Sequence, residues 1–164
     1  MADVENEVHE DVEEQLVVFT LGNELYGVNI EAVNTIIRIP EITQVPHTPD
    51  YVDGVMNLRG VIVPVIDLRR RFSLPTTETT KASRIIVVEE QGMLVGMVVD
   101  TVVETRRLPS SSIEALSPLV VSVDSRYLRG VGKVDDRLII LLALDRVLGE
   151  TEKAELESAV PAQA

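Results

Sequence analysis

The side chains that most often carry catalysis or bind metals are sparse in this sequence. It has no cysteine, and its two histidines lie far apart, His9 in an acidic segment and His47 in a run with two prolines. Neither has a second histidine at metal-ligand spacing, and no thiolate can complete a zinc site. Ser110–Ser112 lack the G-x-S-x-G setting of a nucleophilic serine and instead predict a loop and the N-cap of a helix from Ile113. We therefore predict no catalytic residue, no metal site and no cofactor.

Three further groups of residues have simple structural explanations. Asp135-Asp136 is typical of a hairpin turn rather than of a metal pair. Arg69–Arg71 follows an apolar run, where three arginines are more often a solvated face than a phosphate site. Gly54 and Gly60 lie in predicted hairpin turns and not at the strand-to-helix junction of a phosphate-binding loop.

One cation stands apart, Arg59 in the tetrapeptide Asn57–Gly60. Short β-branched runs on both sides of this Asn/Gly-containing turn predict a tight pair of strands. Pro64 cannot donate to a strand ladder, so its strand is predicted to lie at an edge or to carry a bulge. Arg59 is then a long cation on a turn between apolar strands. Such an arginine is often merely solvated, and spacing alone does not decide its role.

Composition favours a sheet protein that does not bind nucleic acid. The chain has 164 residues, 45% of them hydrophobic, with two Phe, three Tyr and no Trp, so Val, Ile and Leu must build the core. The net charge of −12 comes mostly from the ends: segments 1–14 and 150–164 leave only 16 acidic and 14 basic residues in 15–149. Such a body lacks the basic face of nucleic-acid binders. No apolar run approaches the roughly 20 residues of a membrane span, and the acidic N-terminus is unlike a signal peptide, so we expect a cytoplasmic protein.

Apolar periodicity and turn signals divide the chain into short elements. The predicted strands are 15–21, 25–30, 42–45, two within 51–72, 84–89 and 93–99. Residues 31–38 have apolar side chains at helical spacing and predict a short helix, and another helix is predicted from Leu144. The Thr-rich segment 73–83 is the predicted boundary between subdomains.

The second half repeats the first. Gly27 matches Gly96 at an offset of 69 residues, and Tyr51 matches Tyr127 at an offset of 76, each offset holding for several neighbours. Two constant offsets indicate a duplicated unit with a longer middle in the second copy. Five short strands in each copy favour closure into two small barrels, which removes open edges. Which barrel the N-terminal strand joins stays open, because duplicated barrels can exchange strands. The copies differ at 133–136, where the second lacks the Asn57–Gly60 chemistry, so only the first turn is expected to carry the function.

Four segments resemble the CheW-type coupling proteins of bacterial chemotaxis. They are LVVFTLGNELYGVNI, PHTPDYVDGVMNLRGVIVPVIDL, GMVVDTV and YLRGVGKVDDRLIILLALDRVL, which together span roughly 15–150. The resemblance implies a mainly β fold of two SH3-like five-stranded barrel subdomains with short helices and a C-terminal helix. The charge distribution predicts acidic tails at 1–14 and 151–164, and the resemblance implies a domain at 15–150 with intertwined copies at about 15–72 and 84–148. It also implies an adaptor without enzymatic activity.

The resemblance implies two protein partners as well. Such adaptors couple methyl-accepting chemotaxis proteins to the regulatory domain of the histidine kinase CheA, beneath the membrane and without inserting into it. The groove for the receptor's cytoplasmic tip would include, in this chain, Val33, Ile36, Asn57, Arg59, Ile85 and Val102. The kinase contact would use Val28 and Ile30 as exposed apolar positions, while Thr35 departs from the acidic residue often found at its place.

Two alternatives remain at this point. The module also resembles part of CheA and of CheV, so a CheV-type adaptor without its receiver domain would keep the same interactions. A small-ligand-binding or enzymatic β-barrel is the other alternative, and saturable binding or turnover of a small molecule would reveal it.

Overall fold

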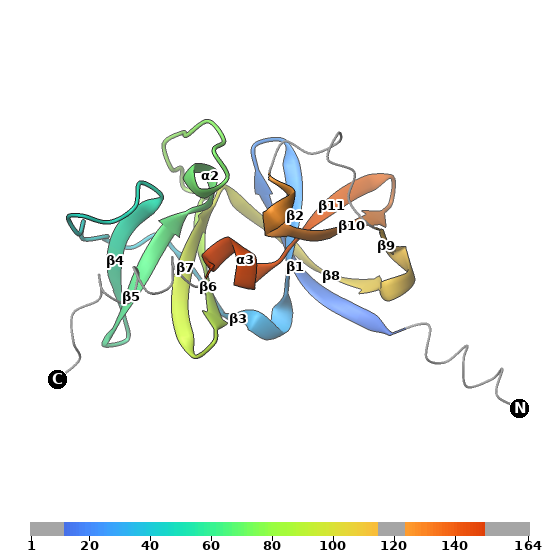
Figure 1. The fold of residues 1–164 in the computed structure, drawn as a ribbon, viewed down its shortest axis with the longest axis horizontal. Coiled ribbons are helices and arrows are strands. Elements are labelled where there is room, and N and C mark those ends of the chain that lie inside the picture. Colours follow the sequence, from blue (N-terminus) through green and yellow to red (C-terminus); the bar gives the residue numbers. More distant parts are fainter. Residues whose placement is uncertain (1–11, 115–123, 150–164) are drawn as a thin grey trace, which may run out of the picture.

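The described residues of this computed structural model, 12–114 and 124–149, form two β-sheets with a few short helices (Figure 1). The predicted mainly β fold with two subdomains and a C-terminal helix is confirmed. The strands are β1 (Glu13–Leu21), β2 (Glu24–Asn29), β3 (Val33–Arg38), β4 (Val52–Leu58), β5 (Val61–Asp67), β6 (Arg84–Glu90), β7 (Met93–Val99), β8 (Thr101–Pro109), β9 (Ile113–Glu114), β10 (Leu128–Val134) and β11 (Arg137–Leu142). The helices are η1 (Ile30–Ala32), α2 (Leu68–Arg71), η2 (Ser110–Ser112), η3 (Ser125–Tyr127) and α3 (Leu144–Leu148).

The two sheets have the same strand plan. The five-stranded sheet has the order β3-β6-β7-β5-β4, and the six-stranded sheet has the order β8-β1-β2-β11-β10-β9, in which β9 is only two residues long. In each sheet two antiparallel hairpins meet along one parallel pair, β5 with β7 and β2 with β11. The matched glycines lie at equivalent places in these pairs, because Gly96 faces Val65 and Gly27 faces Leu141. The repeat seen in the sequence is therefore a repeat of structure.

The position of the N-terminal strands is now resolved. The hairpin β1–β2 leaves the strands that follow it in sequence and joins β8 and β11, while residues 33–99 supply the whole five-stranded sheet. The chain crosses between the sheets twice, through η1 from β2 to β3 and at Asp100 from β7 to β8.

Both faces of most strands are buried, and this explains the continuous apolar runs. On β1, Val17 and Phe19 enter a core shared by the two sheets, while Leu16 and Val18 enter a cluster inside the six-stranded sheet. The five-stranded sheet has an inner cluster of its own. We use "shared core" below for the set Val17, Phe19, Leu21, Tyr26, Val28, Val52, Ile66, Leu68, Phe72, Ile86, Val88, Val95, Met97, Val99, Tyr127, Leu128, Ile140, Leu142, Leu144, Val147 and Leu148. The two sheets thus cover one another, and this apolar burial is the largest favourable contribution to folding.

The predicted helix over 31–38 is wrong. Only Ile30–Ala32 is helical, as one 3-10 turn, and 33–38 is the edge strand β3. Its side chains alternate between half-buried and exposed, and β-branched residues of this kind fit a pleated, half-buried surface. The predicted strand 42–45 is reduced to a single bridge between Thr43 and Val55. The helix predicted from Ile113 is also wrong where it is described, because Ile113–Glu114 is the strand β9.

Pro64 does not mark an edge strand, since β5 pairs with β4 on one side and β7 on the other. The pairing with β7 begins only at Val65, however, and Pro64 faces β4 alone. The missing N–H therefore costs no ladder hydrogen bond to β7, which makes proline acceptable inside the sheet.

Candidate protein-interaction site

The turn between β4 and β5 presents Arg59 to solvent. Arg59 and Gly60 both have positive φ, 52° and 87°, as a two-residue hairpin turn requires. The Asn57 side chain holds the turn, because its Oδ1 accepts a hydrogen bond of 2.8 Å from the Gly60 N–H. A left-handed backbone costs a residue such as arginine about 1–2 kcal/mol relative to its usual conformation. The turn would form more easily with glycine or asparagine at position 59, so the arginine side chain does not contribute to the stability of the turn.

Val33, Ile36 and Val102 lie on β3 and β8, the strands that begin after the two crossings, and the crossings themselves lie at opposite ends of β2. Val33 begins β3 just after η1, Val102 is the second residue of β8, and both side chains are half-buried against the shared core. Ile36 lies further along β3 and is 37% exposed, one of the few large apolar side chains that face solvent. We call these three residues the junction surface.

Two predicted contact residues are not at the surface. Ile85 is fully buried in the inner cluster of the five-stranded sheet, and Val28 is fully buried in the shared core. The expectation that Val28 is exposed is wrong, and neither side chain can meet a partner unless the core opens. Ile30 lies on η1 and is half-buried against the shared core, so part of it faces solvent.

The remaining residues of the predicted receptor groove fall into two parts. The junction surface belongs to β3 and β8, whereas Asn57 and Arg59 belong to the β4–β5 turn. Strands β3 and β4 are the two ends of the five-stranded order, with three strands between them. A partner that contacts both parts must therefore touch β3 and β8 as well as the β4–β5 turn.

The sequence suggested that the arginines after β5 form a solvated face, but in the structure they have specific partners. Arg69 forms a two-bond ion pair with Asp100, through Nε at 2.9 Å and through Nη2. Asp100 also accepts a 2.8 Å hydrogen bond from the Gly22 N–H in the β1–β2 turn. These bonds hold the pKa of Asp100 below its usual value, with the Arg69 hydrogen bond the largest cause and burial opposing it. The network joins α2, the β7–β8 crossing and the turn of the opposite sheet.

Arg71 lies between two tyrosine rings. Its guanidinium carbon is 4.6 Å from the centre of the Tyr51 ring and 4.7 Å from the centre of the Tyr127 ring. Its Nε donates a 2.7 Å hydrogen bond to the Val147 carbonyl near the end of α3. Within the shared core, Tyr127 begins a row of aromatic contacts that continues through Phe72 to Tyr26. Sequence reasoning did not find this site, because its partners lie 20 to 76 residues away in the chain.

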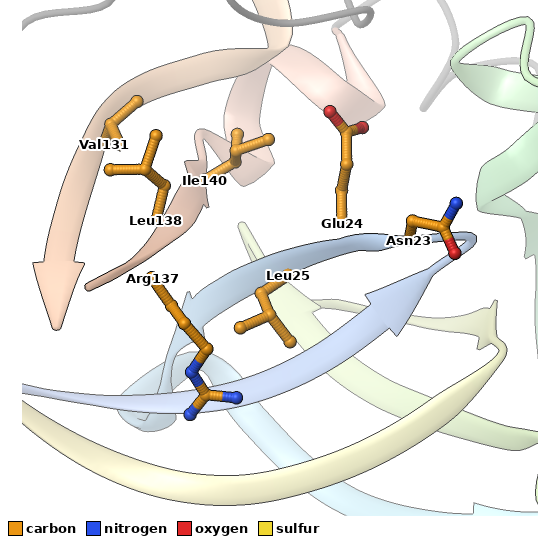
Figure 2. Close-up of a pocket in the computed structure, with 7 residues that line it drawn as sticks. All are labelled: Asn23, Glu24, Leu25, Val131, Arg137, Leu138 and Ile140. Carbon is orange, nitrogen blue, oxygen red and sulfur yellow. The ribbon is translucent and has the colours of Figure 1, made fainter. Parts of the chain in front are cut away.

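An apolar hollow was also missed. It has a volume of about 500 Å³ and lies where β2, β10 and β11 approach one another (Figure 2). Its lining residues are Leu25, Val131, Leu138 and Ile140, with Asn23, Glu24 and Arg137 beside them. Leu138 is 49% exposed. The sequence does not mark this hollow, because Leu138 stands in a continuous apolar run that extends through Leu142.

The acidic and histidine side chains of the described residues do not gather into a metal site. The described residues contain no group of three or more His, Cys, Asp or Glu that could hold a metal ion. His47 is exposed in a loop with positive φ, and Asp135 and Asp136 form the predicted β10–β11 turn. Burial raises the pKa of Asp53, and the nearby Asp67 carboxylate raises it further, whereas Arg70 lowers it. All three residues belong to the five-stranded sheet or to α2, which follows it. None of the helices in the described ranges is long and apolar enough to cross a membrane.

Comparisons with known proteins agree with this architecture. A family model described as a CheW-like domain matches residues 15–152. The chemotaxis protein CheW of Klebsiella aerogenes is 35% identical over 158 residues, which cover 96% of this chain and 95% of that protein. The crystal structure of the scaffolding protein TtCheW from Thermoanaerobacter tengcongensis has a TM-score of 0.79 at 38% identity and covers 88% of this chain and 93% of that one.

A CheV protein is a more distant match. The chemotaxis protein CheV3 of Helicobacter pylori is 25% identical over 134 residues, and the match covers 80% of this chain but only 43% of CheV3. The CheW relative from Klebsiella aerogenes instead matches over 95% of its own length, and the CheW-like family model covers residues 15–152 of this chain. This chain therefore belongs to the CheW-like family of chemotaxis scaffold proteins.

Proposed function

We propose that this protein is a non-enzymatic adaptor that couples methyl-accepting chemoreceptors to the histidine kinase CheA and helps to build their signalling array. The observation that carries the proposal is the match to the CheW-like domain over residues 15–152, together with the 0.79 TM-score to a scaffolding protein. The interaction surfaces support it, because an exposed cation in a strained turn and apolar side chains at a junction suit protein binding better than catalysis.

The receptor's helical cytoplasmic tip is proposed to contact the junction surface and the Arg59 turn. A helix can place apolar side chains at i, i+3 and i+4 against Val33, Ile36 and Val102. Full burial of such a side chain contributes roughly 1.5–3 kcal/mol, and less here because two of the three are already half-buried. After the costs of association this is consistent with docking in about the micromolar range, strengthened by many contacts in an array.

The kinase's regulatory domain is proposed to pair with one subdomain. Ile30 remains a candidate contact because it is part-exposed on η1, whereas Val28 is fully buried and cannot touch the kinase. This contact is independent of Arg59, so the two partners should respond differently to substitutions in the Arg59 turn.

Replacement of Arg59 by glycine tests the receptor contact without harm to the turn. Glycine adopts the positive φ at this position more easily than arginine, so Arg59→Gly should fold with equal or greater stability. A hydrogen bond to a charged group contributes about 1.5–3 kcal/mol, so receptor binding should weaken about tenfold or more. The assay is co-sedimentation with receptor-containing membranes, with and without the kinase, and the parent protein as reference.

The repeat supplies a matched control. Asp136 follows Asp135, the counterpart of Arg59, in the β10–β11 turn and has a φ of 66°. Asp136→Gly therefore changes the same kind of turn in the other sheet and leaves the Arg106–Asp135 ion pair in place. This variant should sediment with receptors as the parent does. If Arg59→Gly also sedimented like the parent, the Arg59 turn would not be part of the receptor site.

A further inference from the structure

The three consecutive arginines of α2 make three different sets of contacts. Arg70 stays with its own sheet, where Nη1 lies 3.5 Å from Asp53 and Nε lies 3.8 Å from Asp67. Arg69 instead reaches Asp100, at the crossing into the six-stranded sheet, and Arg71 reaches Val147 in α3, which follows the last strand of that sheet. The short helix is thus the place where side chains of one sheet hold the other.

Arg69 acts at a crossing. Its partner Asp100 is the single residue between β7 and β8, where the chain leaves the five-stranded sheet. Asp100 is bound in turn to the Gly22 N–H of the opposite sheet. A two-bond arginine–carboxylate pair is specific in direction as well as in distance, so it defines the place of the crossing relative to α2. Val102 of the junction surface follows two residues later.

Arg71 acts across the shared core. Tyr51 precedes β4 of the five-stranded sheet, whereas Tyr127 in η3 and Val147 in α3 flank the last strands of the six-stranded sheet. A planar guanidinium between two rings, with Nε on a carbonyl oxygen, is satisfied in few relative placements of these elements. In Figure 1, α3 lies between the two sheets, where Leu144, Val147 and Leu148 enter the shared core.

The Arg69 and Arg71 contacts give the packing of the two sheets a direction, which the apolar shared core does not. Apolar burial holds the sheets together, but it has no direction and tolerates small sliding of packed layers. We propose that Arg69 and Arg71 are positioning residues, which fix the two sheets in one relative placement and thereby shape the junction surface. The link to receptor binding rests on the proposed function, whereas the placement of the sheets does not.

The absence of cysteine permits a direct test with a pair of spin labels. Val61→Cys on β5 and Leu138→Cys on β11 place one label on each sheet, at side chains that are 46% and 49% exposed. Arg69→Met and Arg71→Met should shift the mean distance between the labels or increase the width of the distance distribution by about half or more, because the packed sheets could then slide. Arg70→Met is the matched control and should leave the distribution unchanged.

A second label pair within one sheet separates sliding from general loosening. Val61→Cys and Gln91→Cys both lie on hairpins of the five-stranded sheet, and their distance should stay the same in every variant. Unchanged distances between the sheets in folded Arg69→Met and Arg71→Met would overturn the inference. If methionine prevents folding, Arg71→Lys keeps the charge without the planar group and should broaden the distribution between the sheets. An unchanged distribution in this variant would likewise overturn the inference.

Binding to the two partners shows whether this positioning serves the adaptor. Without spin labels, Arg71→Met should bind receptor tips several-fold more weakly and should bind the kinase regulatory domain as the parent does, because that contact is proposed to use one subdomain. A general loss of stability would weaken both. Altered sheet placement with unaltered receptor binding would leave the positioning role intact and would refute the proposed location of the receptor groove.

Discussion

Gly54 on β4 is the position where one added methyl group should damage the fold most locally. Its φ is 146°, and a Cβ built there would lie 2.1 Å from the Thr43 carbonyl oxygen and 2.8 Å from the Thr43 carbonyl carbon. Both neighbours are backbone atoms, so no side chain can move aside. The close approach is held by two backbone hydrogen bonds of 2.8 Å between Thr43 and Val55. Gly54→Ala must therefore push the segment around Thr43 away from β4.

The expected cost follows from these contacts. Two backbone hydrogen bonds contribute about 0.5–1.5 kcal/mol each, and the unfavourable φ adds about 1–3 kcal/mol. Gly54→Ala should thus lower the free energy of unfolding by about 2–6 kcal/mol, a large part of the 8–25 kcal/mol that about 0.05–0.15 kcal/mol per residue gives for a chain of this length. Urea unfolding followed by circular dichroism measures the change.

Gly60 provides the control that separates the two causes. Its φ of 87° is also positive, but nothing lies within 4 Å of a Cβ built there. Gly60→Ala should show the backbone cost alone, about 1–2 kcal/mol. Equal losses of stability in Gly54→Ala and Gly60→Ala would show that the collision with Thr43 does not matter, and the reasoning from the close approach would be wrong.

Two further predictions concern an ion pair and two isoleucines. The folded-state pKa of Asp100 lies below its unfolded value, so the stability from its pair with Arg69 is fully present above the unfolded pKa and is lost as the pH falls through the folded pKa. Asp100→Asn should be less stable than the parent at about pH 7, and the difference should shrink toward about pH 3; a constant difference in urea midpoint across this range would refute the assignment. Ile85→Ala should lower the free energy of unfolding by about 2–5 kcal/mol because the side chain is fully buried, whereas Ile36→Ala should cost less than about 1 kcal/mol and weaken receptor binding. Urea unfolding and receptor co-sedimentation of both variants measure these effects, and the reverse pattern would contradict the assignment of Ile36 to the surface.

The sequence was most informative where local chemistry decides the structure. The Asn57–Gly60 turn was predicted because an asparagine and a glycine suit a tight hairpin, and the structure has the Asn57 amide oxygen on the Gly60 N–H. Residues 31–38 misled because apolar side chains at 33, 36 and 37 fit helical spacing as well as a short strand. The β-branched character of Val33, Thr35 and Ile36 should have favoured the strand.

Surface and core were harder to separate from sequence. Alternation assigns side chains to two faces, but here both faces of most strands are buried, so alternation did not show that Val28 and Ile85 are inside. The roles of Arg69 and Arg71 depend on Asp100, Tyr127 and Val147, which only the fold brings near. A run of like charges carries no information about such distant partners.

The interleaved strand order has a consequence for synthesis of the chain on the ribosome. Residues 33–99 can complete the five-stranded sheet as soon as they emerge, but β1 must wait for β8, which is made after that sheet, and β2 must wait for β11, the last strand. During that interval Val17 and Phe19 have only the newly formed sheet to cover them. Translation stopped before residue 137 leaves the first hairpin without β11, its parallel partner, so a nascent chain of that length should be a good substrate for chaperones and proteases.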